Sequence, residues 1–307
     1  MSDERVSSAQ VPPPGELALD HVAHFVPDMD GASLALERLG YALTPFSPQS
    51  HRLTEDGPLV PAGTGNRCVM LERGYLEFLT PTADTPLAAQ LRVAIDRYVG
   101  VHLIAFGTGA PERDYERLER EGYRPLPAVA LQRPVDTSDG SDTARFTVVR
   151  VAPGTMAEGR IQYCEHHTPQ LLWQPRWIQH RNTVVALTGV VLCVEDVREA
   201  AERYSRYTGL PAQATEHGWR IATRRGDVHC ISAQAAREHW RVEPRALPWI
   251  AGPVLAARDL DVLATYVQNA GCPAWPMKEG LRAQLPPELG GLAVFHRAEA
   301  APPAALQ

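Results

Sequence analysis

Four consecutive residues near the middle of the chain, Cys164 to His167, carry side chains of the types that bind transition metals. They read Cys-Glu-His-His and end a short apolar run that has the composition of a β-strand. Because side chains alternate between the two faces of a strand, at most two of the four can face one site. The run therefore offers fewer ligands than a complete metal site needs.

A second polar group follows the glycine-rich stretch Gly63-Thr64-Gly65, where Asn66 and Arg67 are neighbours. An amide and a guanidinium can bind a carboxylate or a carbonyl group of a small molecule, and we assign both residues to substrate binding. A solvated turn without a ligand is the alternative. The glycines do not form a phosphate loop, because neither the dinucleotide-binding pattern nor the P-loop pattern is present.

Covalent catalysis and disulfide bonding have no support in the sequence. The five cysteines are far apart, include no CxxC pair, and lie mostly in apolar runs such as VLCV and VHCIS. None has the cationic neighbours of a reactive thiolate, and the serine-nucleophile pattern GxSxG is missing. We therefore propose no covalent intermediate and no cysteine-based zinc site.

The charges give no sign of a nucleic-acid or membrane partner. The 30 basic and 36 acidic residues, with a net charge of −6, are scattered without the basic stripe of a nucleic-acid-binding protein. No run of eighteen apolar residues occurs, and the polar, proline-rich N-terminus lacks an apolar core. We expect a soluble, cytoplasmic protein. With 44% hydrophobic and 21% charged residues, a chain of 307 residues can form two globular domains.

The elements that would position the polar residues repeat four times along the chain. Each copy has a short β-branched apolar run, a turn, an amphipathic helix and a closing glycine. Asp196 and Asp259 occupy helix N-cap positions, and Gly209 and Gly271 occupy positions where a left-handed residue ends a helix. The four copies span residues 19–40, 100–122, 187–209 and 250–271.

Each helix is followed by a loop and a hairpin-like pair of strands, so that the unit contains a strand, a helix and three strands. One unit cannot bury both faces of its sheet, and units must pair into curved mixed sheets with helices outside. We predict an α+β fold of four βαβββ modules; four unrelated α+β segments are the alternative. The predicted divisions are a flexible tail 1–16, a two-module domain 17–165, a connector 166–184, a second two-module domain 185–298 and a tail 299–307.

Three stretches of the first half, LDHVAHFVPD, GTGN followed by GYLEFLTP, and VHLIAFGT, resemble the vicinal-oxygen-chelate superfamily, especially its glyoxalase-like domains. The resemblance implies paired βαβββ modules and a divalent metal held by side chains of the first and last strands of a module. It also implies substrates that chelate the metal through adjacent oxygens. Glyoxalases, extradiol dioxygenases and epimerases share this fold, so the fold alone does not choose a reaction.

The resemblance assigns one ligand position to the LDHV strand and one to the YLEF strand, which implies His21 and Glu77 as metal ligands. In the second module the matching positions hold Leu103, which cannot bind a metal, and Gln162, a neutral oxygen ligand. The implied site is His21, Glu77 and Gln162 around iron, manganese, nickel or zinc, with one position left open. A hydrogen-bonded core histidine and a buried salt-bridge partner are the alternative for the first two.

Four further histidines are assigned to the same site. His24 is expected to share the inward face of the first strand and to act as an acid or base. His51 is a second acid or base candidate, since it lies in the long loop where glyoxalase-like relatives contact substrate. His102 is a candidate substrate contact, although strand alternation favours the opposite face. His167 is a candidate substrate contact that can also fill the open ligand position.

In the second half the matching positions hold Gly189, His229, Gly252 and Val294, and we interpret this half as scaffold. The predicted function is that of a metal-dependent lyase, isomerase or dioxygenase acting on a small oxygen-rich metabolite. A metal-free small-molecule binding or sequestration protein of the same fold is the alternative, favoured by the leucine in a ligand position. A duplicated half that serves only dimerisation is the third, so that a homodimer is one assembly to consider.

Overall fold

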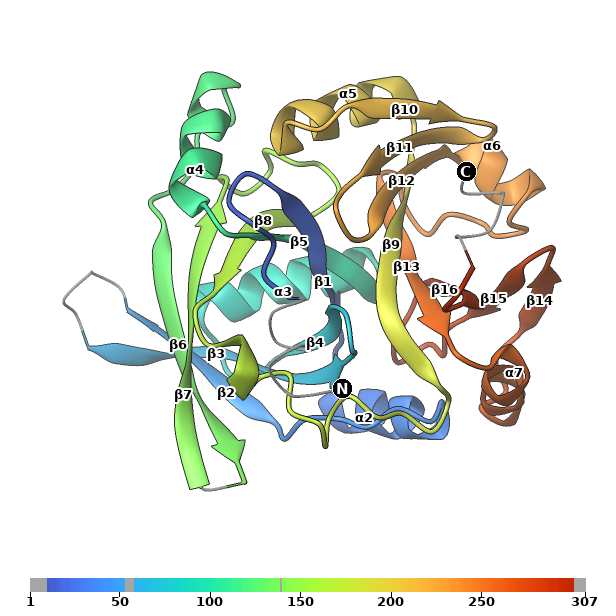
Figure 1. Ribbon diagram of the computed structural model, residues 1–307, viewed down its shortest axis with the longest axis horizontal. Coiled ribbons are helices and arrows are strands. Elements are labelled where there is room, and N and C mark those ends of the chain that lie inside the picture. Colours follow the sequence, from blue (N-terminus) through green and yellow to red (C-terminus); the bar gives the residue numbers. More distant parts are fainter. Residues whose placement is uncertain (1–9, 53–57, 139, 301–307) are drawn as a thin grey trace.

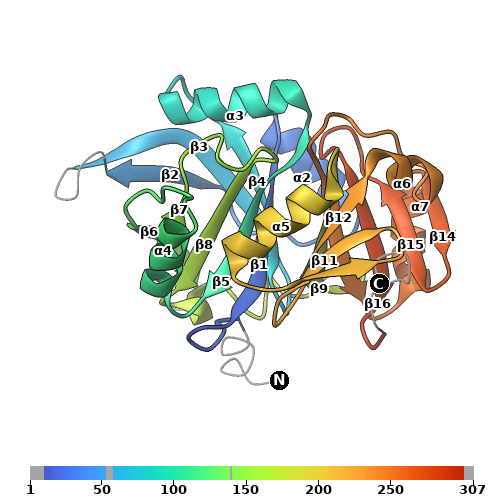
Figure 2. The same ribbon diagram turned by 90° about the horizontal axis from the view of Figure 1, so that it is seen from above.

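One mixed sheet runs through the whole chain. The computed structural model describes residues 10–52, 58–138 and 140–300. Within these residues the sheet has 16 strands. The first half of the chain, in blue to green, and the second half, in yellow to red, lie side by side (Figures 1 and 2). No helix of the described residues is long and apolar enough to cross a membrane.

The first half contains two modules of strand, helix and three strands, as the sequence pattern predicts. The first module consists of β1 (Leu17–Phe25), α2 (Met29–Arg38), β2 (Ser47–Arg52), β3 (Leu59–Met70) and β4 (Tyr75–Pro81). Helix α3 (Pro86–Arg97) connects it to the second module. That module consists of β5 (Gly100–Thr108), α4 (Pro111–Arg120), β6 (Val129–Thr137), β7 (Gly140–Arg150) and β8 (Arg160–His166).

The second half repeats this plan after a connector that contains the short helix η1 (Pro169–Leu171). Its first module consists of β9 (Val184–Val194), α5 (Val197–Thr208), β10 (Ala212–Thr215), β11 (Gly218–Ala222) and β12 (Asp227–Ser232), followed by α6 (Ala233–Glu238). Its second consists of β13 (Trp249–Ala257), α7 (Leu260–Asn269), β14 (Ala274–Met277), β15 (Gly280–Gln284) and β16 (Leu292–Arg297). The predicted fold of four βαβββ modules is confirmed.

The first and last strands of each module pair in parallel: β1 with β4, β5 with β8, β9 with β12 and β13 with β16. Two modules then join through an antiparallel pair of first strands, β1 with β5 and β9 with β13. Strands β5 and β13 join the two halves at the backbone pair Val101 with Ile250, and an isolated bridge pairs Arg73 with Ala186. Each first strand therefore has a neighbour on both sides, which fixes the direction of its side chains.

Local sequence signals define the helix ends. The side chains of Asp28, Asp196 and Asp259 accept hydrogen bonds from backbone N–H groups in the first turns of α2, α5 and α7. Gly209 ends α5 with a φ of 71°, the left-handed conformation that residues with a Cβ rarely adopt. No side chain caps α4, which follows Ala110.

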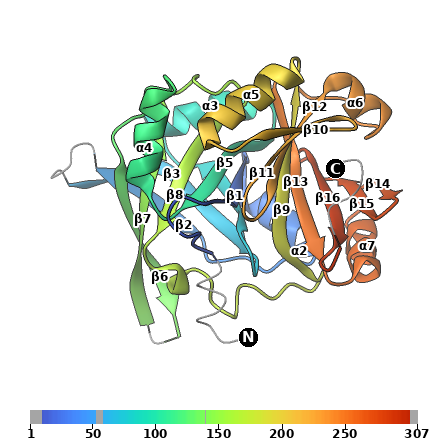
Figure 3. The same cartoon turned by 45° about the horizontal axis from the view of Figure 1, so that its top comes forward.

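The largest apolar core lies on the outer face of the sheet, under the helices. It contains side chains from all four modules, such as Val22, Ile104, Leu192 and Leu255. Burial of each such side chain contributes about 1.5–3 kcal/mol to folding. Helices α4 and α7 lie at opposite ends of the molecule (Figure 3). Because the core is shared, the two halves of the chain support each other.

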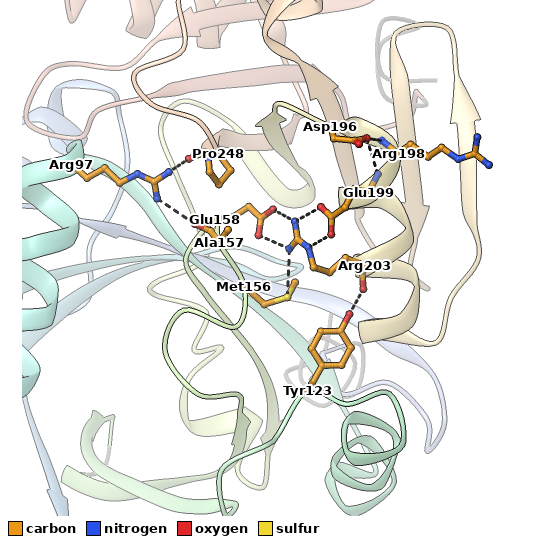
Figure 4. A network of polar contacts seen from close by, with 10 residues as sticks. All are labelled: Arg97, Tyr123, Met156, Ala157, Glu158, Asp196, Arg198, Glu199, Arg203 and Pro248. Atoms are coloured by element: carbon orange, nitrogen blue, oxygen red, sulfur yellow. Dashed lines mark hydrogen bonds and ion pairs between the residues drawn. The ribbon is translucent and has the colours of Figure 1, made fainter.

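A buried ion-pair network also links the two halves (Figure 4). Glu158, fully buried in the loop before β8, accepts hydrogen bonds of 2.7 and 2.8 Å from both Nη atoms of Arg203 on α5. Glu199 binds the Nε atom of the same guanidinium at 2.8 Å. The hydroxyl of Tyr123 donates to the carbonyl of Arg203 at 2.6 Å. Helix α5 is thus attached to the second module by charge as well as by apolar packing.

The N-terminal segment is more ordered than its composition predicts. Residues 1–9 lie outside the described residues, but Gln10 is fully buried. Its amide donates to the carbonyl of Glu72 at 2.7 Å and accepts from the backbone N–H of Gly74 at 3.1 Å. The expected flexible tail of residues 1–16 is therefore too long, because residues 10–16 belong to the fold. The last residues of the expected tail 299–307, from 301 onward, lie outside the described residues.

Candidate functional site

The inner face of the first half, opposite the outer helices, carries the predicted ligand set. Residues paired across a sheet point to the same face, so the strand register identifies this face. His21 of β1 pairs with Ala105 of β5, and Ala105 pairs with Gln162 of β8. Glu77 of β4 pairs with Ala23, which lies on the same face of β1 as His21. His21, Glu77 and Gln162 therefore share one face, with the small Ala105 between two of them.

His21 is held by its neighbour in the sequence. A register shift between Leu19 and His21 interrupts the alternation of β1, so that the side chains of Asp20 and His21 meet. The Nδ1 atom of His21 lies 2.7 Å from Oδ2 of Asp20, and its ring stacks on Tyr75 with 4.3 Å between the ring centres. A carboxylate only accepts hydrogen bonds, so Nδ1 carries a proton, and in the neutral imidazole Nε2 then keeps its lone pair. That atom lies 3.8 Å from Oε2 of Glu77.

Asp20 serves a second histidine, His166 of β8. Its Oδ2 atom lies 2.9 Å from Nε2 of His166, and Sγ of Cys164 lies 3.8 Å from the same nitrogen. Burial raises the pKa of Asp20, but the charge of His166 and the hydrogen bonds from both histidines outweigh this effect and hold the pKa well below its usual range. Asp20 is therefore a carboxylate throughout the physiological pH range.

Asp20, Cys164 and His166 have ligand atoms within 4.8 Å of one another, which is close enough for a metal ion. Within the cluster, Oδ2 of Asp20 accepts hydrogen bonds from both histidines, and burial together with the charge of Asp20 raises the pKa of the Cys164 thiol. Through Oδ2 the cluster orients His21 from behind.

Glu77 is oriented from its other side. Its Oε1 atom accepts a hydrogen bond of 2.5 Å from Asn66, whose own carbonyl accepts one of 3.5 Å from Arg133 of β6. The Oε2 atom remains directed at His21. The side chain of Asn66 thus contacts Glu77, and its assignment to substrate binding stays a prediction.

The donor atoms of this face fit a divalent ion. Two ligands that bind one ion at about 2.0–2.2 Å stand at most about 4 Å apart, and the 3.8 Å between His21 Nε2 and Glu77 Oε2 is within this limit but too long for a hydrogen bond. An imidazole nitrogen, a carboxylate oxygen and the amide oxygen of Gln162 suit iron, manganese, nickel or zinc. Leu103, in the fourth position, is buried and offers no donor.

His24 does not belong to this site. It is three residues after His21, an odd number, and pairs with Phe78, which follows Glu77 and points to the opposite face. Its ring stacks on Phe78, and its Nδ1 atom lies 3.0 Å from the carbonyl of Leu289. Burial lowers the pKa of His24 to about 4. The expectation that His24 shares the face of His21 is wrong.

Three other assigned residues are also placed away from the pair of His21 and Glu77. His102 is packed between the rings of Phe25 and Tyr98, with Nε2 at 2.7 Å from the carbonyl of Tyr98. Arg67 pairs with Phe78 and therefore points to the outer face. His167 binds the hydroxyl of Thr147 at 2.8 Å on the exposed side of β8. A direct role of these three side chains at the site is not supported.

His51 lies in β2, where its backbone pairs with Val60. Its side chain lies outside the described residues, so its assignment as an acid or base stays a prediction.

Sequence reasoning missed Asp20 and only partly found His166. The alternation rule for the Cys164–His167 run is confirmed, because Cys164 and His166 face Asp20 while Glu165 and His167 contact each other at 3.7 Å. Asp20 immediately precedes His21, and ordinary alternation would send it to the other face. Only the register shift in β1, which has no sequence signal, brings it to the two histidines.

Arginines also face inward in the second module. Arg150 of β7 pairs with Gln162, and Arg160 of β8 pairs with Leu103. Burial and the charge of Arg150 lower the pKa of Arg160 to about 10, against the opposing effect of Glu77. Burial lowers the pKa of Arg150 as well.

The inner face of the second half is mainly apolar but also carries polar side chains. Val191 and Val294 belong to a separate apolar cluster, while His229 pairs with Val191 and Arg282 pairs with Val294. His229 is buried at the position of a last-strand ligand, and a Cβ at Gly189 would approach its ring to 3.0 Å. The interpretation of this half as scaffold stays a prediction.

Paired βαβββ modules with an inward-facing histidine and glutamate define a protein of the vicinal-oxygen-chelate superfamily. Residues 19–208 match the model of a family described as a glyoxalase-like domain, and because the match covers more than half of the chain, the chain belongs to this family. The resemblance predicted from the sequence is confirmed. No curated protein sequence matches the chain.

Solved structures share the fold at low sequence identity. A hypothetical protein from Staphylococcus aureus is 9% identical, with a TM-score of 0.61 over 92% of this chain and 99% of that chain. A mutant of 4-hydroxymandelate synthase from Streptomyces coelicolor is 14% identical, with a TM-score of 0.54 over 94% and 95% of the two chains. A xylose isomerase-like TIM barrel/4-hydroxyphenylpyruvate dioxygenase fusion protein is 10% identical, with a TM-score of 0.50 over 94% of this chain and 51% of that chain.

Proposed function

We propose that this protein is a metal-dependent enzyme that acts on a small oxygen-rich metabolite at the inner face of its first half. His21, Glu77 and Gln162 hold a divalent ion such as iron, manganese, nickel or zinc. One observation carries the proposal: the lone pair of His21 Nε2, which the bond to Asp20 leaves free, faces Oε2 of Glu77 at 3.8 Å. At 3.8 Å the two atoms are too far apart for a hydrogen bond, so both remain available to a third partner.

The side chains around these ligands keep them in place. Asp20 fixes the tautomer and the ring orientation of His21, and Asn66 fixes the carboxylate of Glu77. Tyr75 packs against the imidazole and keeps water from its face. When bound, the ion would chelate two substrate oxygens and stabilise negative charge on them, which is the chemistry that lyases, isomerases and dioxygenases of this fold share.

Metal binding should be measurable but modest. The site offers two firm ligands and one amide, and Leu103 leaves the fourth position without a donor. The positive charge of Arg160, which acts on Glu77, opposes a dication. A metal-free binding protein of the same fold is the competing function, and metal analysis separates the two.

The experiment is metal analysis of protein purified without chelator, followed by titration with Fe²⁺, Mn²⁺, Ni²⁺ and Zn²⁺. We expect one ion per chain for the wild type and none for His21→Ala. His167→Ala, which removes an exposed histidine of the same half, is the control and should bind like the wild type. If the wild type binds none of the four ions, or if both variants bind as well as it does, the proposal is wrong.

A further inference from the structure

Two arginines lie close together on the inner face of the first half with no partner for their charges. Arg150 pairs with Gln162, and Arg160 stands two residues before Gln162 on the same face of β8. Both side chains are half-buried. Within the described part of the chain neither guanidinium forms a salt bridge or a hydrogen bond, and the Nε atom of Arg150 is buried without a partner. The guanidinium of Arg160 lies over the ring of Phe25, whose centre is 5.9 Å away.

The balance of charge around this pair is positive. The charged groups that act on Arg160 are Arg150 and Glu77, so that two guanidiniums share one carboxylate, and Glu77 does not form an ion pair with either. Removing a guanidinium from water without a counter-charge is costly, and an anionic ligand would offset this cost. The pair therefore lacks an anionic partner.

We infer that Arg150 and Arg160 bind a carboxylate group of the substrate. The planar fork of a guanidinium matches the two oxygens of a carboxylate, which makes arginine the preferred residue for this contact. Gln162 links this subsite to His21, because Arg150 pairs with Gln162 and both Gln162 and His21 pair with Ala105 across the sheet. The inference deepens the proposed function and rests on it in one respect: the remaining oxygens of the same substrate would reach the ion. The substrate class is then a small carboxylic acid with further oxygens.

Helix α3 covers part of this face. Phe25, Leu79 and Leu103 belong to one buried apolar cluster that includes Leu91 of α3, and Arg160 lies next to Phe25. A groove of about 210 Å³ beside the connector is lined by Arg133, which donates to Asn66 at the site, and by the carboxylate of Asp136.

The test uses trifluoroacetate, a small carboxylate that ¹⁹F NMR detects at weak binding, with the full-length protein. We expect saturable binding to the wild type and no binding of the neutral trifluoroacetamide. Arg150→Met and Arg160→Met should each weaken binding by about tenfold, which corresponds to about 1.4 kcal/mol. The matched control is Arg145→Met, because Arg145 is exposed on the same strand and an odd number of residues from Arg150. It should change the affinity less than twofold.

A stability measurement accompanies each variant. Since the two guanidiniums repel each other in the free protein, replacing one by methionine should leave the unfolding temperature unchanged or raise it. A variant that loses both stability and trifluoroacetate binding would show a structural arginine and overturn the inference. Absence of saturable binding, or equal losses for Arg145→Met and the two inner variants, would overturn it as well.

The metal proposal and this inference fail in different ways. The titration is repeated after chelator treatment and with His21→Ala. Binding that survives both but is lost in the arginine variants supports the carboxylate subsite even if the protein binds no metal. If trifluoroacetate binding requires the metal and is unchanged in the arginine variants, the proposed carboxylate subsite is wrong and the metal site remains supported.

Discussion

At the scale of single residues, the site depends on a carboxylate that serves two histidines. Asp20 Oδ2 accepts hydrogen bonds from His21 at 2.7 Å and from His166 at 2.9 Å, and it is completely buried. Without it, the imidazole of His21 could change its tautomer and turn its lone pair away from Glu77. Asp20 is therefore a positioning residue for the proposed metal site.

We predict that Asp20→Asn weakens metal binding by about 10–100-fold, the usual effect of losing a carboxylate behind a histidine ligand. The amide keeps the volume of the side chain but can no longer accept from both histidines with a full negative charge. Competition titration with a metal-sensitive dye measures the change. Asp84→Asn, at an almost fully exposed carboxylate, is the control. An affinity equal to that of the wild type would show that His21 does not need Asp20.

A second residue-scale prediction concerns His24 and the loss of stability in acid. Burial holds the pKa of His24 at about 4, against 6.5 in the unfolded chain, so between these pH values only the unfolded chain takes up the proton. Stability is therefore fully present above pH 6.5 and is lost as the pH falls towards 4. A shift of this size corresponds to roughly 3 kcal/mol at the acid end. His102, with a pKa of about 4, adds a similar loss.

Urea unfolding at pH 7.5 and pH 4.5 measures this dependence. The difference in unfolding free energy between the two pH values should be smaller in His24→Gln than in the wild type, whatever the overall stability of the variant. His167→Gln, at the exposed histidine, should retain the wild-type difference. Equal pH dependence in all three proteins would contradict the role of His24.

The residues show what the sequence can and cannot reveal about the site. The resemblance to a known family identifies three residues of the site, because its ligand positions lie in regular strands. The strand register brings these residues, His21, Glu77 and Gln162, to one face. His24 was assigned to that face wrongly, because its distance of three residues reverses the direction of a strand side chain. The role of Asp20 cannot be predicted from the sequence, because its contact with His21 depends on a register shift in β1 that no residue type indicates.

At the scale of elements, the periodic helices were predictable and the irregular connections were not. Helices α2, α5 and α7 begin at aspartate caps that the sequence displays. Helix α3 also has a readable signal, since Thr85 caps it and Pro86 opens it, but it lies outside the repeated plan. The repeated plan predicts a further strand after each of the four helices but not its position. These strands are β2, β6, β10 and β14, and their positions cannot be read from the sequence because short or polar edge strands lack an alternating apolar pattern.

The attachment of α5 to the second module gives an element-scale prediction. Arg203 binds the fully buried Glu158 through two hydrogen bonds, and Glu158→Gln leaves its guanidinium with Glu199 as the remaining counter-charge. The substitution should lower the free energy of unfolding by about 1.5–3 kcal/mol, the usual contribution of hydrogen bonds to a charged group. The control is Glu202→Gln, which breaks the exposed pair with Arg198 and should cost less than about 0.5 kcal/mol. Urea denaturation compares the two, and similar losses would argue against a special role of the buried pair.

At the scale of the whole molecule, the two halves are less independent than a repeated sequence suggests. The main apolar core takes side chains from all four modules. The backbone of β1 also bonds to the second half, with Leu19 N donating to the carbonyl of Arg225 at 2.7 Å and Arg224 N donating to that of Leu17 at 2.8 Å. The family match runs from residue 19 to residue 208 and thus continues through β9 and α5. The predicted domains 17–165 and 185–298 therefore correspond to the two copies of the repeat, and we do not expect them to fold independently.

We predict that the full chain unfolds in a single cooperative transition and that residues 1–183 alone do not fold. Separation of the halves would expose the shared core and leave Glu158 without Arg203, and a small domain cannot tolerate losses of that size when its net stability is about 5–15 kcal/mol. Calorimetry should give equal calorimetric and van't Hoff enthalpies for the full chain. Near-ultraviolet circular dichroism should show no native signal for the fragment. Two separate transitions, or a fragment with the native near-ultraviolet spectrum and bound metal, would show instead that the first half carries both the fold and the site by itself.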